Sequence, residues 1–149
     1  MTAKTKTILL IEDDPSDVDL TRRALAKGRI VNELVVASDG QEALDYLFGT
    51  GEYAGRDTSK SPTLTLLDLK LPKVSGLDVL RRIRTDASTR RMPVVILTSS
   101  REEQDMAASY DLGVNSYIRK PVDFGQFVQS VAQLGLYWLV LNEEPPKVR

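Results

Sequence analysis

Short apolar runs recur along the chain, and each is followed by a stretch with the spacing of an amphipathic helix. Five of these runs are candidate buried strands: residues 8–11, 34–37, 64–67, 93–97 and 114–118. Runs in which consecutive residues are apolar are typical of strands buried on both faces of a parallel sheet. Strands that alternate with helices form βαβ units, whose right-handed crossovers allow few arrangements. We therefore predict an α/β fold, a doubly wound five-stranded parallel sheet with helices on both faces.

The helical patterns have recognisable starts. The first begins at Pro15, with Asp14 as its N-cap and Asp17 in its first turn. The others are expected at about residues 39–48, 79–83 and 102–110, and from residue 123 with a continuation that can reach residue 141. Residues 49–62 are rich in Gly, Ser, Thr and charge, which predicts a long exposed loop.

Two missing residue types limit the chemistry. The sequence contains no histidine and no cysteine. This excludes histidine general-base catalysis, Ser–His and Cys–His nucleophile pairs, and metal sites built from histidine or thiolate. Any chemistry must use carboxylates, hydroxyls, lysine and arginine.

The net charge of −1 gives no overall basic field to attract nucleic acid or membrane, and no apolar run predicts a signal peptide or a membrane span. We expect a cytoplasmic protein.

Polar side chains follow four of the predicted strands. Glu12 and Asp13 come after the first strand, Asp68 after the third, Thr98 after the fourth and Lys120 after the fifth. In open α/β sheets, ligands bind outside the carboxyl ends of the strands, and these ends all point the same way in a parallel sheet. Three carboxylates, one hydroxyl and one ammonium are therefore expected at one edge.

Such a group of charges favours the binding of a cation and the transfer of a phosphoryl group. Each close pair of carboxylates costs about 1 kcal/mol in water and more at a lower dielectric. A hard divalent cation relieves the repulsion, and all-oxygen ligation fits Mg²⁺. An aspartate beside Mg²⁺ and a lysine can act as a nucleophile toward a phosphoryl group, whose charge the two cations neutralise.

Each of these residues also has an ordinary structural explanation. Glu12 and Asp13 can be a solvated strand end, Asp68 can begin a β-turn, Thr98 can cap a turn, and Lys120 can be a surface charge. The prediction of a site rests on their joint placement, because all of these separate explanations would have to hold at once.

The pattern resembles the response-regulator receiver domain of bacterial two-component signalling. The resemblance covers about residues 6–134, and it implies a flavodoxin-like strand order, 2-1-3-4-5. On this basis residues 1–149 form one receiver domain, with a C-terminal extension and tail over 135–149. The matching positions are the acidic pair Glu12 and Asp13 in LLIEDDP; Asp68, Pro72 and Gly76 in LLDLKLPKVSG; Thr98, 30 residues after Asp68; Lys120 and Pro121, with Lys120 22 residues after Thr98; and Tyr117, three residues before Lys120.

This resemblance implies a role for each acidic residue. Asp68 would accept a phosphoryl group from the phosphohistidine of a sensor histidine kinase. Asp13 would bind Mg²⁺ directly and Glu12 through water, with further ligands from Asp68 and the backbone carbonyl of Lys70. Lys70 lies where asparagine is frequent in such proteins, and its side chain could shield the phosphoryl group or point into water.

The remaining positions would carry the response. The resemblance implies that Lys120 contacts the phosphoryl group and that the bond between Lys120 and Pro121 is cis. Thr98 would move toward the phosphoryl oxygens, and Tyr117 would turn inward behind it. These movements would couple a local change of charge to a two-state switch.

Two further segments resemble the response regulators that work with bacterial phytochromes. They are GTGEYAGRDTSKSPTL, at residues 49–64, and LGLYWLVLNEEPP, at residues 134–146. This narrower resemblance implies a kinase partner of the phytochrome type.

The second segment also predicts self-association. Six successive apolar residues, 136–141, cover the whole circumference of a helix, so some would face water in a monomer. We expect a homodimer through the face formed by the helix at 102–110, the strand at 114–118 and the last helix. The alternative is that this segment folds back on its own domain. The expected interface residues are Leu136, Tyr137, Trp138, Leu139 and Leu141.

Three other functions are weighed against the phosphoacceptor. A phosphatase with an aspartyl intermediate would place a second aspartate two residues after the nucleophile, where this chain has Lys70. An incomplete acidic set would favour a binding module that never uses phosphate, but the set in this chain is complete. A transcription factor needs a DNA-binding domain, and eight residues follow Leu141. We expect no enzyme beyond self-phosphorylation and autodephosphorylation at Asp68, and no nucleic-acid or membrane partner.

Overall fold

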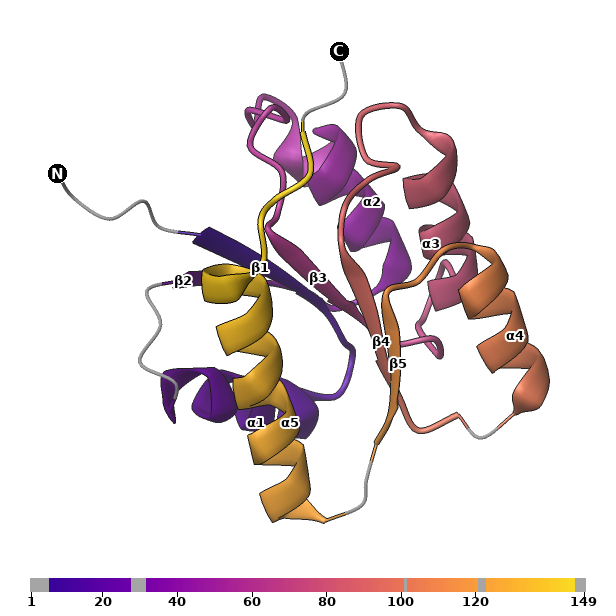
Figure 1. Ribbon diagram of the computed structural model, residues 1–149. Coiled ribbons are helices and arrows are strands. Elements are labelled where there is room, and N and C mark those ends of the chain that lie inside the picture. The colour runs from indigo at the N-terminus through magenta and orange to yellow at the C-terminus, as the bar shows by residue number, and fades with distance from the viewer. Residues whose placement is uncertain (1–5, 28–31, 101, 121–122, 147–149) are drawn as a thin grey trace, which may run out of the picture.

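A single parallel sheet organises the molecule. The computed structural model describes residues 6–27, 32–100, 102–120 and 123–146. The sheet has the order β2-β1-β3-β4-β5, as Figure 1 shows, and this confirms the predicted fold class and the order 2-1-3-4-5. Its strands are β1 (Lys6–Ile11), β2 (Asn32–Ala37), β3 (Leu64–Leu67), β4 (Val94–Thr98) and β5 (Ser116–Arg119).

Helices cover both faces of this sheet. α1 and α5 pack on one face, and α2, α3 and α4 lie on the other (Figure 1). No helix in the described ranges has the length and apolar composition needed to cross a bilayer. The helices are α1 (Pro15–Lys27), α2 (Gly40–Phe48), α3 (Gly76–Thr85), α4 (Glu103–Asp111) and α5 (Phe124–Leu136), with a short 3₁₀ helix η1 (Gly51–Tyr53) and a π-helical turn η2 (Tyr137–Leu141).

The apolar runs follow from this two-sided burial. In β1, Ile8 and Leu10 pack toward α1 and α5, whereas Leu9 and Ile11 pack toward α2 and α3. Each of the four is at most 2% exposed. Since successive strand side chains point to opposite faces, both faces need apolar residues, and the strand reads as a continuous apolar run.

Side-chain caps fix where the helices begin. Asp14 Oδ1 accepts a hydrogen bond from the Ser16 backbone N–H at 2.9 Å, so Asp14 caps α1 as predicted. Asp39, Ser75 and Asp123 cap α2, α3 and α5 in the same way. Because α1, α3 and α5 each start soon after a strand ends, their first turns lie at the carboxyl edge of the sheet.

The segment at residues 49–62 is anchored to α2, although the sequence predicts only a long exposed loop. The Arg56 guanidinium lies 4.0 Å from the centre of the Tyr46 ring, and its Nε donates to the Tyr46 carbonyl at 2.6 Å. Tyr53 donates its hydroxyl hydrogen to Glu42 at 2.9 Å. These contacts between the segment and α2 give it a fixed path that its composition does not reveal.

The fifth strand begins two residues later than predicted. Val114 is buried in the turn after α4, and Asn115 Oδ1 accepts a hydrogen bond from the Val94 backbone N–H at 2.8 Å. The Asn115 backbone N–H in turn donates to the Val94 carbonyl at 2.9 Å, so Asn115 leads into the pairing with β4, and β5 itself starts at Ser116.

The C-terminal extension packs back on its own domain through part of its length. Leu139 is 3% exposed, and its carbonyl accepts a hydrogen bond from Lys6 Nζ at 2.7 Å. Further on, Glu144 accepts a hydrogen bond from Thr63 Oγ1 at 3.0 Å. Lys6 and Thr63 lie at the amino ends of β1 and β3, so the extension covers the sheet edge opposite the predicted site.

Gly76 should be required for stability. A Cβ atom at this position would overlap the Asp68 carbonyl oxygen, which is backbone and cannot move aside cheaply. Gly76→Ala is therefore expected to lower the free energy of unfolding by more than about 2 kcal/mol in urea titrations. Gly125→Ala is the control, since its nearest atom, Asp123 Oδ1, is at 3.7 Å, and alanine should be neutral or stabilising in a helix. Equal stability of the two variants would contradict the close packing of Gly76.

Candidate functional site

Three carboxylates meet at the carboxyl edge of the sheet. Glu12 and Asp13 follow β1 and Asp68 follows β3, and one oxygen of each lies within 4.8 Å of the others. They meet because β1 and β3 are neighbours that pair in parallel up to Ile11 and Leu67. Glu12 and Asp68 are buried, whereas Asp13 is exposed. The predicted acidic group is therefore assembled, with one side open to solvent, and its oxygen donors suit a hard divalent cation.

Lys120 lies among these carboxylates. Its Nζ donates to Glu12 Oε2 at 2.7 Å, to Asp17 Oδ2 at 2.8 Å and to Asp68 Oδ2 at 3.2 Å. Its backbone N–H donates to the Thr98 carbonyl at 2.6 Å, which fixes the end of β5 against β4. One ammonium group thus contacts carboxylates from the ends of β1 and β3 and from α1.

Burial and the neighbouring charges have opposite effects on the pKa values of Glu12 and Lys120. Burial raises the pKa of Glu12 to about 7, although the bond and the charge of Lys120 lower it. Burial alone would lower the pKa of Lys120, but its bonds to Asp17 and Glu12 and the charge of Asp68 hold this pKa above its usual value. Lys120 is therefore a charged ammonium at neutral pH.

Thr98 lies beside the site and is linked to the neighbouring loop. It is fully buried, and its Oγ1 accepts a hydrogen bond from the Ser100 backbone N–H at 3.2 Å. Ser100 Oγ donates to Asp105 at 2.6 Å, and Tyr117 donates its hydroxyl hydrogen to the Ser100 carbonyl at 3.4 Å. In the described part of the chain Thr98 makes no hydrogen bond to Asp68, so the structure connects Thr98 to α4 and β5 rather than to the carboxylates.

The remaining predicted positions are less constrained. The Lys70 side chain is exposed, in keeping with the alternative that it points into water, and its backbone N–H donates to Asp68 Oδ1 at 3.4 Å. The backbone carbonyl of Lys70 as a metal ligand stays a prediction. Pro121 and its expected cis bond lie outside the described residues.

Three residues of the site are absent from the sequence-based prediction. Asp17 can be expected from the sequence only as a favourable charge in the first turn of a helix, yet it contacts Lys120. Ser100 and Asp105 join the loop after β4 to the first turn of α4. A signal for Asp17 was present, because the first turn of a helix that follows an acidic strand end lies at the same edge of the sheet.

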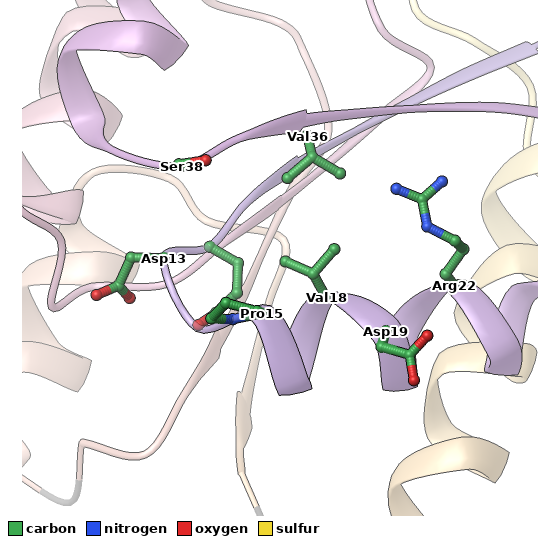
Figure 2. Close-up of a pocket in the computed structure, with 8 residues that line it drawn as sticks. Asp13, Pro15, Val18, Asp19, Arg22, Val36 and Ser38 are labelled. Atoms are coloured by element: carbon green, nitrogen blue, oxygen red, sulfur yellow. The ribbon is translucent and has the colours of Figure 1, made fainter.

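An open hollow adjoins the acidic pair on the side of β2. Figure 2 shows Val18 of α1 facing Val36 of β2, with Asp13 toward one end and Arg22 toward the other. Its middle is apolar. The end at Asp13 carries the acidic pair, whereas the other end carries Asp19 beside Arg22.

Fold and site together define a class: a doubly wound α/β protein with an acidic centre, a charged lysine and a buried threonine at the carboxyl ends of its strands. The family model for the response regulator receiver domain matches residues 8–132. The chain belongs to this family.

Its relatives match over nearly the whole chain. Response regulator Rcp1 of Synechocystis sp. is 40% identical over 134 residues, which are 90% of this chain and 89% of Rcp1. The crystal structure of the phosphorylated cyanobacterial phytochrome response regulator RcpA has a TM-score of 0.88 at 41% identity, covering 96% of this chain and 100% of that one. The bacteriophytochrome response regulator RtBRR has a TM-score of 0.76 at 52% identity, covering 96% of this chain and 86% of that one.

Removing the Lys120 charge should destabilise the protein when no divalent cation is present. Lys120→Met leaves Glu12, Asp17 and Asp68 without the ammonium that contacts them, and we expect a loss of about 2 kcal/mol in urea unfolding with EDTA. A divalent cation should restore part of this loss, because it can bind the carboxylates. Lys73→Met is the control, since Lys73 pairs with Asp39 at 3.4 Å but is 68% exposed, and it should change stability by less than about 0.5 kcal/mol. Equal losses in both variants would show that Lys120 does not balance the acidic group.

Proposed function

We propose that this protein is a phosphoacceptor response regulator, which receives a phosphoryl group on Asp68 from a sensor histidine kinase. It then signals through a conformational switch and contacts with other proteins. The observation that carries this proposal is the position of Asp68, a buried carboxylate that contacts Lys120 and lies beside Glu12 and Asp13. Within the described residues, no other aspartate belongs to both the acidic group and the Lys120 contacts.

The proposed step moves one phosphoryl group. A carboxylate oxygen of Asp68 attacks the phosphorus of the donor, and the bond between phosphorus and the imidazole nitrogen of the kinase phosphohistidine breaks. The electron pair of that bond stays on the nitrogen, and Asp68 becomes an aspartyl phosphate. In the separate hydrolysis step, water attacks the phosphorus and gives up a proton, the bond to the Asp68 oxygen breaks with its electron pair left on that oxygen, and inorganic phosphate leaves. The protein is thus itself the substrate of both steps.

We propose Mg²⁺ as the cofactor, held by Glu12, Asp13, Asp68 and the backbone carbonyl of Lys70. The donor set is all oxygen, and its exposed member, Asp13, leaves room for retained waters, which Mg²⁺ prefers. Rcp1 has been crystallised in a Mn²⁺-bound form, which supports a divalent ion in this family. The ion would neutralise charge on the phosphoryl oxygens during transfer.

Lys120, Thr98 and Tyr117 would convert this change of charge into a change of shape. Lys120 Nζ lies 3.2 Å from Asp68 and can turn to a phosphoryl oxygen with little movement. A Thr98 side chain drawn toward that group would give up its bond from the Ser100 N–H. Because Ser100 also bonds Asp105 and Tyr117, the movement would reach α4 and β5.

We propose a phytochrome-type kinase as the donor. RcpA is a cyanobacterial phytochrome response regulator, and RtBRR is a bacteriophytochrome response regulator. Each match covers 96% of this chain, which leaves too few residues outside it to omit either the segment at residues 49–64 or the C-terminal extension entirely.

Asp68 should be labelled by a small phosphodonor. Incubation with acetyl phosphate and Mg²⁺ is expected to add the mass of one phosphoryl group to the intact protein, and EDTA should abolish the addition. Asp68→Asn should remain unlabelled. The control is Asp14→Asn, because Asp14 caps α1 from an exposed position and should leave labelling intact. Labelling of Asp68→Asn equal to that of wild type would contradict the assignment.

We also propose a homodimer through the face of α4, β5 and α5, with an apolar patch of the C-terminal extension taking part. Leu139 belongs to the core of its own domain and Trp138 packs partly against that core, so neither offers a full side chain to a partner. Large apolar side chains left in water favour an interface. The C-terminal apolar patch consists of Leu136, Tyr137, Val140 and Leu141, which are 48%, 49%, 56% and 64% exposed.

Leu141→Glu should therefore yield a folded monomer. In a two-fold pair each substitution acts twice, and a buried glutamate without a partner is costly. Light scattering at tens of micromolar checks the mass, with circular dichroism to confirm folding. Ala54→Glu adds the same charge to the exposed segment beside α2 and should leave the dimer intact. A monomeric wild type, with and without phosphodonor, would end this proposal.

A further inference from the structure

We propose that Asp17 is a positioning residue, which holds the Lys120 ammonium beside the phosphoacceptor while a cation occupies the acidic group. This inference rests on the proposed function and adds a residue to its site. Asp17 is neither the expected phosphoacceptor nor one of the expected metal ligands.

The contact between Asp17 and Lys120 is close. Asp17 Oδ2 accepts the Lys120 hydrogen bond at 2.8 Å, whereas Asp68 Oδ2 accepts one at 3.2 Å. The Asp17 side chain is 26% exposed and that of Lys120 is 11% exposed, so the pair is partly shielded from water. A charge-assisted hydrogen bond in such a place constrains the lysine more than a surface pair would.

The backbone of Asp17 is itself well fixed. Asp14 caps the helix, and its carbonyl accepts a hydrogen bond from the Val18 backbone N–H at 3.0 Å. One turn further on, the buried Thr21 donates its hydroxyl hydrogen to the Asp17 carbonyl at 2.8 Å. The carboxylate of Asp17 therefore projects from a rigid first turn of α1.

Of the three carboxylates that contact Lys120, two would also bind a cation and one would not. Glu12 and Asp68 belong to the group of carboxylates within 4.8 Å that can hold a metal ion, whereas Asp17 does not. A bound divalent cation would compete with Lys120 for the charge of Glu12 and Asp68. Asp17 would then be the carboxylate partner that the ammonium keeps, and a flexible lysine stem gains most from such a fixed partner.

Loss of the Asp17 carboxylate should slow both the phosphorylation of Asp68 and the later hydrolysis of its phosphoryl group. A well-placed ammonium neutralises charge on the equatorial oxygens whether the phosphoryl group arrives or leaves. Asp17→Asn keeps a hydrogen-bond acceptor but loses the charge. We expect it to slow phosphorylation by acetyl phosphate and the subsequent hydrolysis by about three- to tenfold each, the size of one partly exposed charge-assisted bond.

The test measures these two rates at saturating Mg²⁺, together with Mg²⁺ affinity by calorimetry. Asp19→Asn is the matched control, because Asp19 lies on the same helix and its exposed carboxylate pairs with Arg23 at 3.0 Å. The control should retain wild-type rates. Asp17→Glu keeps a carboxylate and should recover part of the lost rate.

A double substitution separates positioning from a general effect of charge. In a Lys120→Ala background, Asp17→Asn should have almost no further effect, because the group that it positions is gone. Rates for Asp17→Asn equal to those of Asp19→Asn would overturn the proposal. So would an undiminished effect in the Lys120→Ala background, or a Mg²⁺ affinity of Asp17→Asn so far below that of wild type that the metal no longer saturates the site. If wild type is not labelled at all, the proposed function fails and this inference fails with it; normal labelling of wild type beside an unaffected Asp17→Asn removes this inference alone.

Discussion

The ammonium of Lys120 lies among carboxylates that come from β1, β3 and α1, and the arrangement of the site depends on this contact. Without it, Glu12 and Asp68 would be two buried acids next to each other at the end of a parallel sheet. The cost of such a cluster is normally met by protonation, by a counter-charge or by a metal ion. Here the counter-charge comes from the end of β5, so the far side of the sheet is tied to its centre. A phosphoryl group or a cation at Asp68 would change this balance, and the proposed switch depends on that change.

The two ends of the sheet carry different tasks. The acidic group and the proposed phosphoacceptor lie at the carboxyl edge, while the C-terminal extension packs across the amino ends of β1 and β3 through Lys6 and Thr63. At the carboxyl edge, Ser100 joins the loop after β4 to α4 and to Tyr117 of β5. A change at Asp68 therefore has a connected set of contacts through which it can alter the face proposed for dimerisation.

Much of this organisation could be read from the sequence. Buried parallel strands have apolar residues on both faces, so β1 and β4 stand out as continuous runs, and the polar residues that follow them must lie at one edge. The sequence places Asp17 at the right edge of the sheet, but its contact with Lys120 depends on how α1 is rotated against the sheet, which local spacing does not define. The anchoring of residues 49–62 was missed because it depends on Arg56 stacking on Tyr46, a contact between residues ten positions apart. The six apolar residues of the C-terminal run cannot be divided into buried and exposed positions from the sequence. In the structure, the π-helical turn buries Leu139 and leaves Val140 exposed.

The most direct test is a crystal structure of the protein with Mg²⁺ and beryllofluoride, a stable mimic of an aspartyl phosphate. We expect the mimic on an oxygen of Asp68, the metal ion between Asp13 and Asp68, and Lys120 Nζ in contact both with the mimic and with Asp17. A mimic bound to another carboxylate, or a Lys120 side chain turned away into solvent, would contradict the central claim that this lysine contacts both the phosphoacceptor Asp68 and Asp17.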